Sequence, residues 1–359
     1  SLYFLLSLVA LSDHYYHHVA VSGFVPFRPL QRHKHSYDSH CSLKMTTKTN
    51  PEIIAPIIII GVAADSGCGK STFMRRLTSS LDGNNKVGPL GGGFGKKDDG
   101  WETNTLVSDL ITVICLDDYH TNDREGRRIS GLTALDPCEN NFDLMYEQLK
   151  ALKDGETVLE KPIYNHVNGT LDKPETIKPT PIIIIEGLHP MFDERVRDLI
   201  DFSLYLDISD EVKLNWKIQR DMKERGHSLE SIMASIEARK PDFDAFIAPQ
   251  KKFADLIIEV LPTMLNSEDK ETLRVRSIQK CDIPDLDPCY LFDEGSKIEW
   301  TPCNRKLSRK EPGLKFASGP DVYFDQPVHV LEMDGTFGNI QELVYVEHHM
   351  KNTGTKYYG

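Results

Sequence analysis

The sequence has no block of lysine and arginine residues of the kind that binds nucleic acids. Aspartate and glutamate (54 residues) outnumber lysine and arginine (42 residues), and the formal charge at pH 7 is −12. Such a surface would repel the phosphates of a nucleic acid, so we expect no nucleic-acid partner. An anionic small molecule would have to be bound by a local group of basic side chains.

Long apolar runs are also scarce. One run, SLYFLLSLVALS (residues 1–12), is too short to span a bilayer but has the length of a signal-peptide core. We find no other transmembrane candidate, and we expect no membrane association. Cysteine is limited to 7 scattered residues, an odd number. This pattern excludes the dense disulfide framework of a small secreted protein and predicts mostly reduced thiols.

Residues 1–50 have the composition of a targeting presequence. The apolar run is followed by a basic, hydroxyl-rich stretch (residues 19–50) with a single acidic residue, Asp38. A signal-like core followed by a transit-like stretch resembles the bipartite presequences of plastids bounded by additional membranes, and it predicts delivery to the plastid stroma. A disordered or mistranslated leader is the alternative, because Met45 could be a start.

Five continuous apolar runs predict buried β-strands. They lie at residues 57–63, 110–116, 181–187, 202–208 and 254–261, with helical patterns between several of them. Continuous hydrophobicity is typical of parallel strands covered on both faces, so we predict an α/β fold with a mostly parallel central sheet flanked by helices. Such sheets bind ligands at the carboxyl ends of their strands.

The predicted core covers residues 51–265 and contains one glycine-rich insert (residues 83–104), which we interpret as a surface loop. Beyond it, residues 266–359 contain short β-like segments: TLRVRSIQ, SKIEW, PVHVLEM and LVYVEHH. We predict that they extend the same sheet as additional antiparallel strands and contribute to a homodimer contact.

The segment ADSGCGKS (residues 64–71) fits the phosphate-loop pattern G-x-x-x-x-G-K-S/T, with alanine in the first position. A strand precedes it and a helix follows, as the motif requires, whereas a chance match in a tight turn is the alternative. Backbone N–H groups and Lys70 would bind the phosphates of ATP, and the hydroxyl of Ser71 would hold Mg²⁺. The predicted nucleotide-binding residues are Ala64, Asp65, Ser66, Gly67, Cys68, Gly69, Lys70, Ser71 and Thr72.

Two acidic residues end predicted strands. Glu186 follows four isoleucines, where a carboxylate is costly unless it is used, and we predict that it binds Mg²⁺; a helix cap is the alternative. Asp117 ends another strand and could accept a proton from an attacking hydroxyl. The adjacent Asp118 is expected to be a capping or supporting residue rather than a catalytic one.

Basic residues gather in two places. One is DREGRR (residues 123–128), and the other is KIQRDMKERGHSLE (residues 217–230), which we expect to be helical from Lys217 to Arg225. Lys217, Asp221 and Arg225 share a helical face, with Arg220 beside it. From spacing alone, a solvated ladder of ion pairs explains this helix at least as well as a binding site.

Several segments together resemble the phosphoribulokinases of plants and algae. The resemblance runs from Ile57 to the C-terminal end, apart from the glycine-rich insert, and includes the signature K-I-x-R-D-x-x-x-R-G-x-S-x-E at residues 217–230. The segments that carry it include GVAADSGCGKSTFMRRLTS, VICLDDYH, LDPCENNFDLMYEQLKALK, KPIYNHVNGTLD, IIEGLHPMFDERVRDLIDFSLYLDIS and YLFDEGSKIEW.

The resemblance implies a P-loop kinase fold and transfer of the ATP γ-phosphoryl group, with Mg²⁺, to the C1 hydroxyl of ribulose 5-phosphate in carbon fixation. It implies Asp117 as catalytic base, with Lys70 and Glu186 at the phosphates and metal. Arg128 stands where plant members have lysine. The residues it implies on the substrate side are His120, Arg124, Arg128, Tyr164, His166, Lys217, Arg220, Asp221 and Arg225.

The resemblance also implies redox control by a disulfide between Cys68 and Cys115, which thioredoxin opens. Because Cys68 lies beside Lys70 at a predicted helix N-terminus, we expect a reactive thiolate there; the alternative is that both cysteines only fill the core. A second, C-terminal pair of the family is incomplete, since Cys303 is present but Arg309 occupies the partner position. Association with glyceraldehyde-3-phosphate dehydrogenase and a small disordered linker protein is therefore left open.

Two other functions fit parts of the sequence. A uridine kinase-like nucleoside kinase would share the sheet, the phosphate loop and the acid at Asp117, but its uncharged substrate would not need Arg124, Arg220 and Arg225 together. A catalytically silent nucleotide-binding scaffold would not need Lys70, Asp117 and Glu186 together.

Overall fold

The computed structural model describes residues 56–65, 68–70, 73–74, 77–78, 106–225, 228–269, 271–283, 297–301, 313–337 and 342. The presequence, the glycine-rich insert, Cys303, Arg309 and the segment LVYVEHH lie outside these residues. Within the described part of the chain, no helix is both long enough and apolar enough to cross a bilayer.

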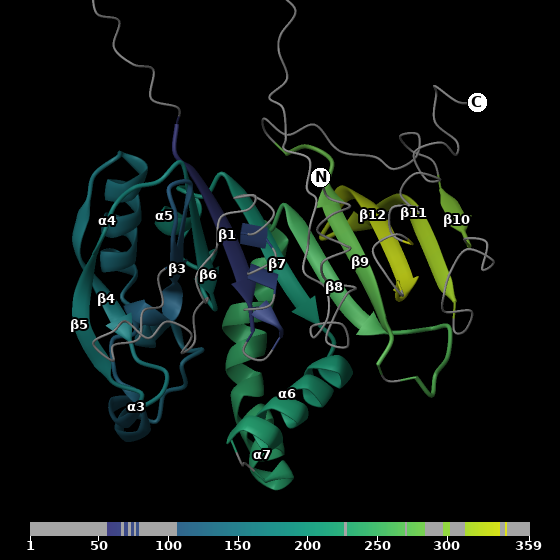
Figure 1. The fold of residues 1–359 in the computed structure, drawn as a ribbon, viewed down its shortest axis with the longest axis horizontal. Coiled ribbons are helices and arrows are strands. Elements are labelled where there is room, and N and C mark those ends of the chain that lie inside the picture. Colours follow the sequence, from purple (N-terminus) through teal and green to yellow (C-terminus); the bar gives the residue numbers. More distant parts are fainter. Residues whose placement is uncertain are drawn as a thin grey trace, which may run out of the picture.

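A ten-stranded sheet forms the centre of the molecule (Figure 1), in the order β10-β11-β12-β9-β8-β7-β1-β6-β3-β2. Its five central strands are parallel: β3 (Ile111–Cys115), β6 (Ile182–Gly187), β1 (Ile58–Ala64), β7 (Phe202–Ile208) and β8 (Leu256–Pro262). They coincide with the five predicted apolar runs, so the predicted parallel sheet is confirmed. The short strand β2 (Leu106–Val107) pairs antiparallel with β3.

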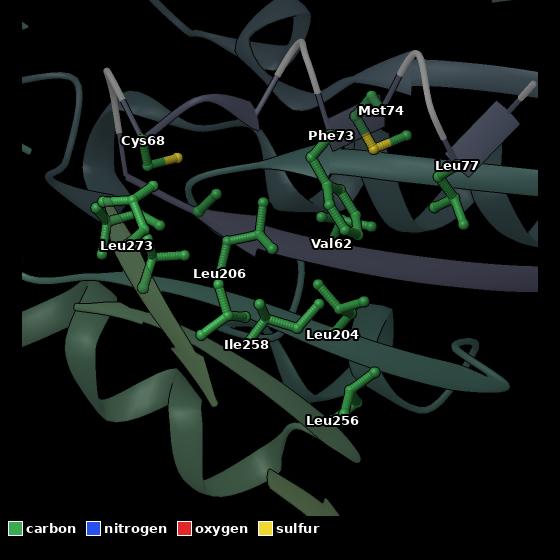
Figure 2. Packing of buried hydrophobic residues seen from close by; sticks show 14 of the residues in the cluster. Val62, Cys68, Phe73, Met74, Leu77, Leu204, Leu206, Leu256, Ile258 and Leu273 are labelled. Atoms are coloured by element: carbon green, nitrogen blue, oxygen red, sulfur yellow. The ribbon is translucent and has the colours of Figure 1, made fainter. Parts of the chain in front are cut away.

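Both faces of these strands are buried, which explains their continuous hydrophobicity. On one face Val62, Leu206 and Ile258 pack against Phe73 and Met74, which follow the phosphate loop (Figure 2). On the other face, strand residues such as Ile59, Ile183 and Ile185 pack against helix α4 (Phe142–Lys153). Successive strand side chains therefore alternate between two cores.

Helices cover the sheet and begin at side-chain caps. The side chain of Asn141 accepts a hydrogen bond from the N–H of Leu144 at the start of α4, and Asp123 caps α3 (Arg124–Ser130) in the same way. Helix α5 (Glu194–Arg197) lies near α4, whereas α6 (Asp210–Arg225) and α7 (Leu229–Asp242) lie together beyond the carboxyl ends of the central strands (Figure 1). Helix α6 confirms the helix predicted from Lys217 to Arg225. The chain then forms a π-helical turn (Phe243–Ile247) and a 3-10 turn (Ala248–Phe253) before β8.

A separate two-stranded sheet was not predicted from the sequence. Strands β4 (Val158–Tyr164) and β5 (Leu171–Ile177) form an antiparallel hairpin next to α4. Each strand contains a proline, Pro162 or Pro174, which weakens the sequence signal for a strand and is tolerated here because both strands lie at an edge.

Antiparallel strands extend the main sheet after β8, as predicted for the C-terminal region. They are β9 (Leu273–Lys280), β10 (Ile298–Trp300), β11 (Leu314–Tyr323) and β12 (Gln326–Gly335). Strand β11 was not predicted, because its Gly319 and Pro320 resemble a turn. The tight turn between β11 and β12 places Phe324 and Asp325 at positive φ (48° and 61°), the backbone shape of a type I′ hairpin.

Candidate active site

Three polar segments meet at the carboxyl ends of adjacent strands. The phosphate loop follows β1, a 3-10 turn (Leu116–Tyr119, η1) follows β3, and Glu186 lies at the end of β6. Strand β6 lies between β1 and β3, so Glu186 is in register with both Val62 and Cys115. The sheet topology thus brings together Lys70, Asp117 and Glu186, the three predicted catalytic residues.

Lys70 forms an ion pair with Glu186. Burial alone would lower the pKa of Lys70, but the negative charges of Glu186 and Asp117 raise that pKa above its ordinary value. The lysine is therefore cationic, and its partner is a carboxylate that an incoming phosphate group can replace.

Asp117 is flanked by two imidazole rings. Its carboxylate oxygens lie 4.0 Å from Nε2 of His120 and 3.9 Å from Nε2 of His166. Burial would raise the pKa of Asp117, but His120, Lys70 and other basic groups together lower it to about 2. Both distances exceed hydrogen-bond length, so neither ring is directly hydrogen-bonded to the carboxylate.

Aromatic contacts orient the two histidines. The ring of Tyr164 meets the rings of His120 and His166 edge to face, at centroid distances of 5.3 and 5.1 Å. Nδ1 of His120 lies 3.3 Å from the carbonyl oxygen of Glu139, so a proton on Nδ1 leaves Nε2 free to accept a proton. Burial lowers the pKa of His120 and favours this neutral form.

A buried ion-pair network supports the turn that carries Asp117. Lys161 on β4 is fully buried, donates to Asp118, and also lies 3.3 Å from Glu175 on β5. The other oxygen of Asp118 accepts a hydrogen bond of 2.8 Å from the N–H of Tyr164. Asp118 therefore supports the site, as predicted, by fastening the β4–β5 hairpin to the turn that carries Asp117.

The three arginines of α3 differ in what they contact. Arg124 donates to the carbonyl of His166, and Arg127 donates to the hydroxyl of Tyr164 at 2.6 Å. Arg128 is instead largely exposed and forms a bidentate pair with Glu125. The structure thus places Arg124 beside the predicted substrate residues, whereas Arg128, which was predicted to bind substrate, is exposed and paired with Glu125.

The environment of Cys68 contradicts the expectation of a stabilised thiolate. Cys68 is buried at the edge of the core that contains Val62, Leu206 and Leu273 (Figure 2). Burial raises the pKa of its thiol to about 12, because the loss of water outweighs the nearby charge of Lys70. Burial likewise raises the pKa of Cys115.

Strand β6 separates β3, which ends at Cys115, from β1, which precedes the phosphate loop. No disulfide joins the cysteines within the described residues, where both thiols are free.

The start of the phosphate loop is fixed to helices α6 and α7. Asp65 pairs with Lys213 at 3.2 Å and with Arg239 at 3.7 Å. Gly69 has a φ of +74°, and a Cβ atom there would lie 3.1 Å from the ring of Trp216. Only glycine allows this loop shape without strain.

The helix after Gly69 presents a site for phosphate groups. Phe73 donates its N–H to the carbonyl of Gly69, so a helix begins there, and the first N–H groups of a helix are suited to bind an anion. Together with Lys70 and the carboxylate of Glu186, this arrangement fits a nucleoside triphosphate with its Mg²⁺.

Some predicted site residues lie outside the described part of the chain. These are Ser66, Gly67, Ser71 and Thr72 in the loop, together with the side chains of Lys217, Arg220, Asp221 and Arg225 on α6.

The sequence assigned no individual role to four residues that the structure places at or next to the site. Arg127 contacts Tyr164, Lys161 contacts Asp118, and Lys213 contacts Asp65. His189 is buried against the rings of Phe142 and Phe192, and burial lowers its pKa to about 4, so it is a neutral core residue at neutral pH. One sequence signal could have favoured Arg127 over Arg128 as the substrate residue. Glu125 and Arg128 stand at helical i, i+3 spacing, which predicts that Arg128 pairs with Glu125 instead.

Comparisons with known proteins agree with this arrangement. Residues 59–267 match the Phosphoribulokinase / Uridine kinase family. The chain is 65% identical over 304 residues to the chloroplastic phosphoribulokinase of Mesembryanthemum crystallinum, covering 84% of this chain and 74% of that protein. It is 60% identical over 303 residues to the chloroplastic phosphoribulokinase of Chlamydomonas reinhardtii, covering 84% of this chain and 78% of that protein. A uridine kinase of Limosilactobacillus reuteri is 32% identical over 206 residues, covering 56% of this chain and 82% of that protein.

Proposed function

The chain belongs to the phosphoribulokinase/uridine kinase family, and we infer that it is the ATP-dependent kinase that phosphorylates ribulose 5-phosphate at its C1 hydroxyl. The product, ribulose 1,5-bisphosphate, is the sugar consumed in carbon fixation. The observation that carries this function is the high identity to phosphoribulokinases, which extends over most of the chain and is about twice the identity to the uridine kinase.

The decisive assay measures ADP release from ATP and Mg²⁺ with ribulose 5-phosphate, with uridine, or with neither. We expect turnover with ribulose 5-phosphate alone. Turnover with uridine would indicate the nucleoside kinase, and no turnover with either compound would indicate a silent scaffold.

We propose that Lys70 exchanges Glu186 for the phosphates of ATP. The first N–H groups of the helix after Gly69 would bind the same phosphates. Glu186, once released, and Ser71 would hold Mg²⁺, which shields the charge of the phosphates during transfer. Since Glu186 is already a buried carboxylate at the strand end, the residues present fit the metal.

Asp117 is proposed as the group that orients the C1 hydroxyl and accepts its proton. A pKa of about 2 makes a weak base in the free protein. Phosphate groups bound at Lys70 would add negative charge nearby and raise this pKa toward the working range. His166, 3.9 Å from the same carboxylate, would contact the sugar on the other side of the hydroxyl.

The sugar phosphate is proposed to bind between α3, the β4–β5 hairpin and α6. Arg124 and Arg127 on α3 already contact His166 and Tyr164 of that hairpin. On α6, the role predicted for the basic residues Lys217, Arg220 and Arg225, and for Asp221 beside them, remains a proposal. A cationic pocket is needed because the protein as a whole is negative.

Arg127 and Arg128 form a matched pair for testing the substrate side. Arg127→Gln is expected to lower kcat/KM for ribulose 5-phosphate by roughly tenfold or more, because a charged hydrogen bond to Tyr164 is lost. Arg128→Gln should stay near wild type, because its partner is the exposed Glu125. Steady-state kinetics of both variants measure the difference, and a larger loss for Arg128→Gln would restore that residue as the substrate ligand.

Redox control through Cys68 and Cys115 is a further part of the proposal. Strand β6 separates β3, which ends at Cys115, from β1, which precedes the loop that carries Cys68. A disulfide requires Cα atoms within about 7 Å, so its formation would hold the phosphate loop against the end of β3. We propose that this constraint displaces Lys70 and Asp117 together and that thioredoxin is the reductant that reverses it.

We expect the oxidised protein to lose most of its activity and to regain it with dithiothreitol. Cys68→Ser should stay active after oxidation, whereas Cys138→Ser, which changes an exposed thiol, should respond as the wild type does. Full activity of the oxidised wild type would show that these thiols are not a switch.

The relatives named chloroplastic support a plastid location. We propose that the bipartite presequence directs the protein to the stroma of a complex plastid, with a mature start between Phe24 and Ile53 that N-terminal sequencing would locate.

A homodimer is proposed as the assembled state, and light scattering would contradict it by reporting a monomer. Association with glyceraldehyde-3-phosphate dehydrogenase and a linker protein stays open and can be tested by co-elution.

A further inference from the structure

A thiol, a carboxylate and an imidazole meet beside the phosphate loop. Cys115, Asp117 and His166 each offer one ligand atom, and these three atoms lie within 4.8 Å of one another. They come from three different segments: the end of β3, the turn η1 and the connection between β4 and β5. The fold, rather than a local sequence motif, therefore creates this cluster.

The ring nitrogen of His166 has an unmet bonding capacity. Its Nε2 atom is buried without a hydrogen-bond partner, and it lies 3.9 Å from Asp117, which is too far for a hydrogen bond. Bonds of about 2.0–2.3 Å to a tetrahedral zinc ion place two ligand atoms about 3.4–3.6 Å apart. A shift of a few tenths of an ångström would bring the imidazole and the carboxylate to that separation.

We propose that Cys115, Asp117 and His166 form an inhibitory site for a thiophilic divalent cation, with Zn²⁺ as the representative ion. Sulfur, nitrogen and oxygen are the ligand set of zinc, whereas Mg²⁺ takes oxygen ligands almost alone. Binding replaces the thiol proton of Cys115, which is released to solvent, and leaves a fourth position open to water.

The charges around the cluster permit such an ion. The thiolate and the carboxylate of Asp117 together balance the two positive charges of the cation. Lys70, whose positive charge acts on Asp117, is paired with Glu186. The side chains of Asp117 and His166 are 25% and 26% exposed, so an ion can enter from the solvent side although Cys115 is buried.

The inhibitory consequence rests on the proposed kinase function, because the ion would occupy the oxygen that receives the hydroxyl proton. The site itself does not depend on that function. The same ion would also hold the thiol of Cys115, so the site would exist only in the reduced protein.

Direct metal binding tests the site without any turnover. Reduced, metal-free protein is titrated with Co²⁺, which gives a thiolate-to-cobalt charge-transfer band when a cysteine binds it, and Zn²⁺ is then added in competition. We expect one Co²⁺ per chain, displaced by Zn²⁺. Cys115→Ser and His166→Asn should each lose the band. His166 lies in the partly exposed connection between β4 and β5, so His166→Asn removes a ligand without changing the core.

Two matched variants separate this site from the other thiols. Cys68→Ser, at the neighbouring loop, and Cys138→Ser, at an exposed position, should both keep the band. A band that survives in Cys115→Ser, or that is absent from the wild type, would overturn the site.

The kinase assay tests the consequence separately. With Mg²⁺ in excess, one equivalent of Zn²⁺ is expected to lower the rate at least tenfold, and a zinc-selective chelator should restore it. A cobalt band without inhibition by Zn²⁺ would overturn the inhibitory role. Absence of turnover in the zinc-free protein supplied with Mg²⁺ would instead count against the proposed kinase function.

Discussion

Asp117→Asn is expected to lower kcat by roughly two to four decades, which is the usual contribution of a positioned general base. Asparagine has nearly the same shape and keeps one oxygen facing His120 or His166, but it cannot accept the proton of the C1 hydroxyl. The KM for ATP should change little, because Asp117 is not part of the phosphate loop. Steady-state kinetics with each substrate varied in turn measure both quantities.

Asp109→Asn is the matched control for this variant. Asp109 is exposed and lies just before the opposite end of the same strand, β3, so the same chemical change there should leave kcat near the wild-type value. An Asp117→Asn variant with unchanged kcat would exclude Asp117 as the base. A rise in KM for ATP without a fall in kcat would assign it to nucleotide binding instead.

The parallel core was predictable because its signal is local and strong. The run Ile182–Ile185 is apolar at every position because both faces of the strand are buried, and a carboxylate directly after such a run is costly unless it is used. The phosphate loop could be predicted for a similar reason, because its glycines and Lys70 form a contiguous motif.

The sequence concealed features that depend on neighbours far apart in the chain. The β4–β5 hairpin contains prolines, and its position depends on Lys161 reaching Asp118 across 43 positions of sequence. The pKa of Cys68 could not be predicted, because its neighbour Lys70 is visible in the sequence whereas the core that covers the thiol is not. Arg127 and Arg128 differ only in the direction that α3 gives them.

Lys161→Met is expected to lower the free energy of unfolding by roughly 3–5 kcal/mol, the cost of removing one partner of a buried ion pair. Methionine fills a similar volume, so the loss comes from charge rather than from a cavity. Lys161 and Asp118 are fully buried, and burial alone would lower the pKa of Lys161, but Asp118 and Glu175 raise it and keep the side chain cationic. Without that cation, both carboxylates remain inside the protein uncompensated.

An exposed pair of the same chemistry provides the control. Lys150 pairs with Asp154 at 2.8 Å on the surface of α4, with side chains 51% and 54% exposed, and Lys150→Met should leave the free energy of unfolding near the wild-type value. Urea unfolding of both variants measures the contrast. The double variant Lys161→Met/Asp118→Asn should recover part of the loss, because the asparagine removes one buried charge and still accepts the hydrogen bond from Tyr164.

The same variant should also lose activity, because the Lys161 network holds the hairpin that carries Tyr164 and His166 against the turn that carries Asp117. We expect the kinase activity of Lys161→Met to fall at a temperature where the protein is still folded by circular dichroism, with KM for ribulose 5-phosphate raised more than KM for ATP. Equal losses of stability in Lys161→Met and Lys150→Met would mean that the buried network does not stabilise this fold. A destabilised variant with unchanged KM for ribulose 5-phosphate would mean that the network stabilises the protein without positioning the sugar side of the site.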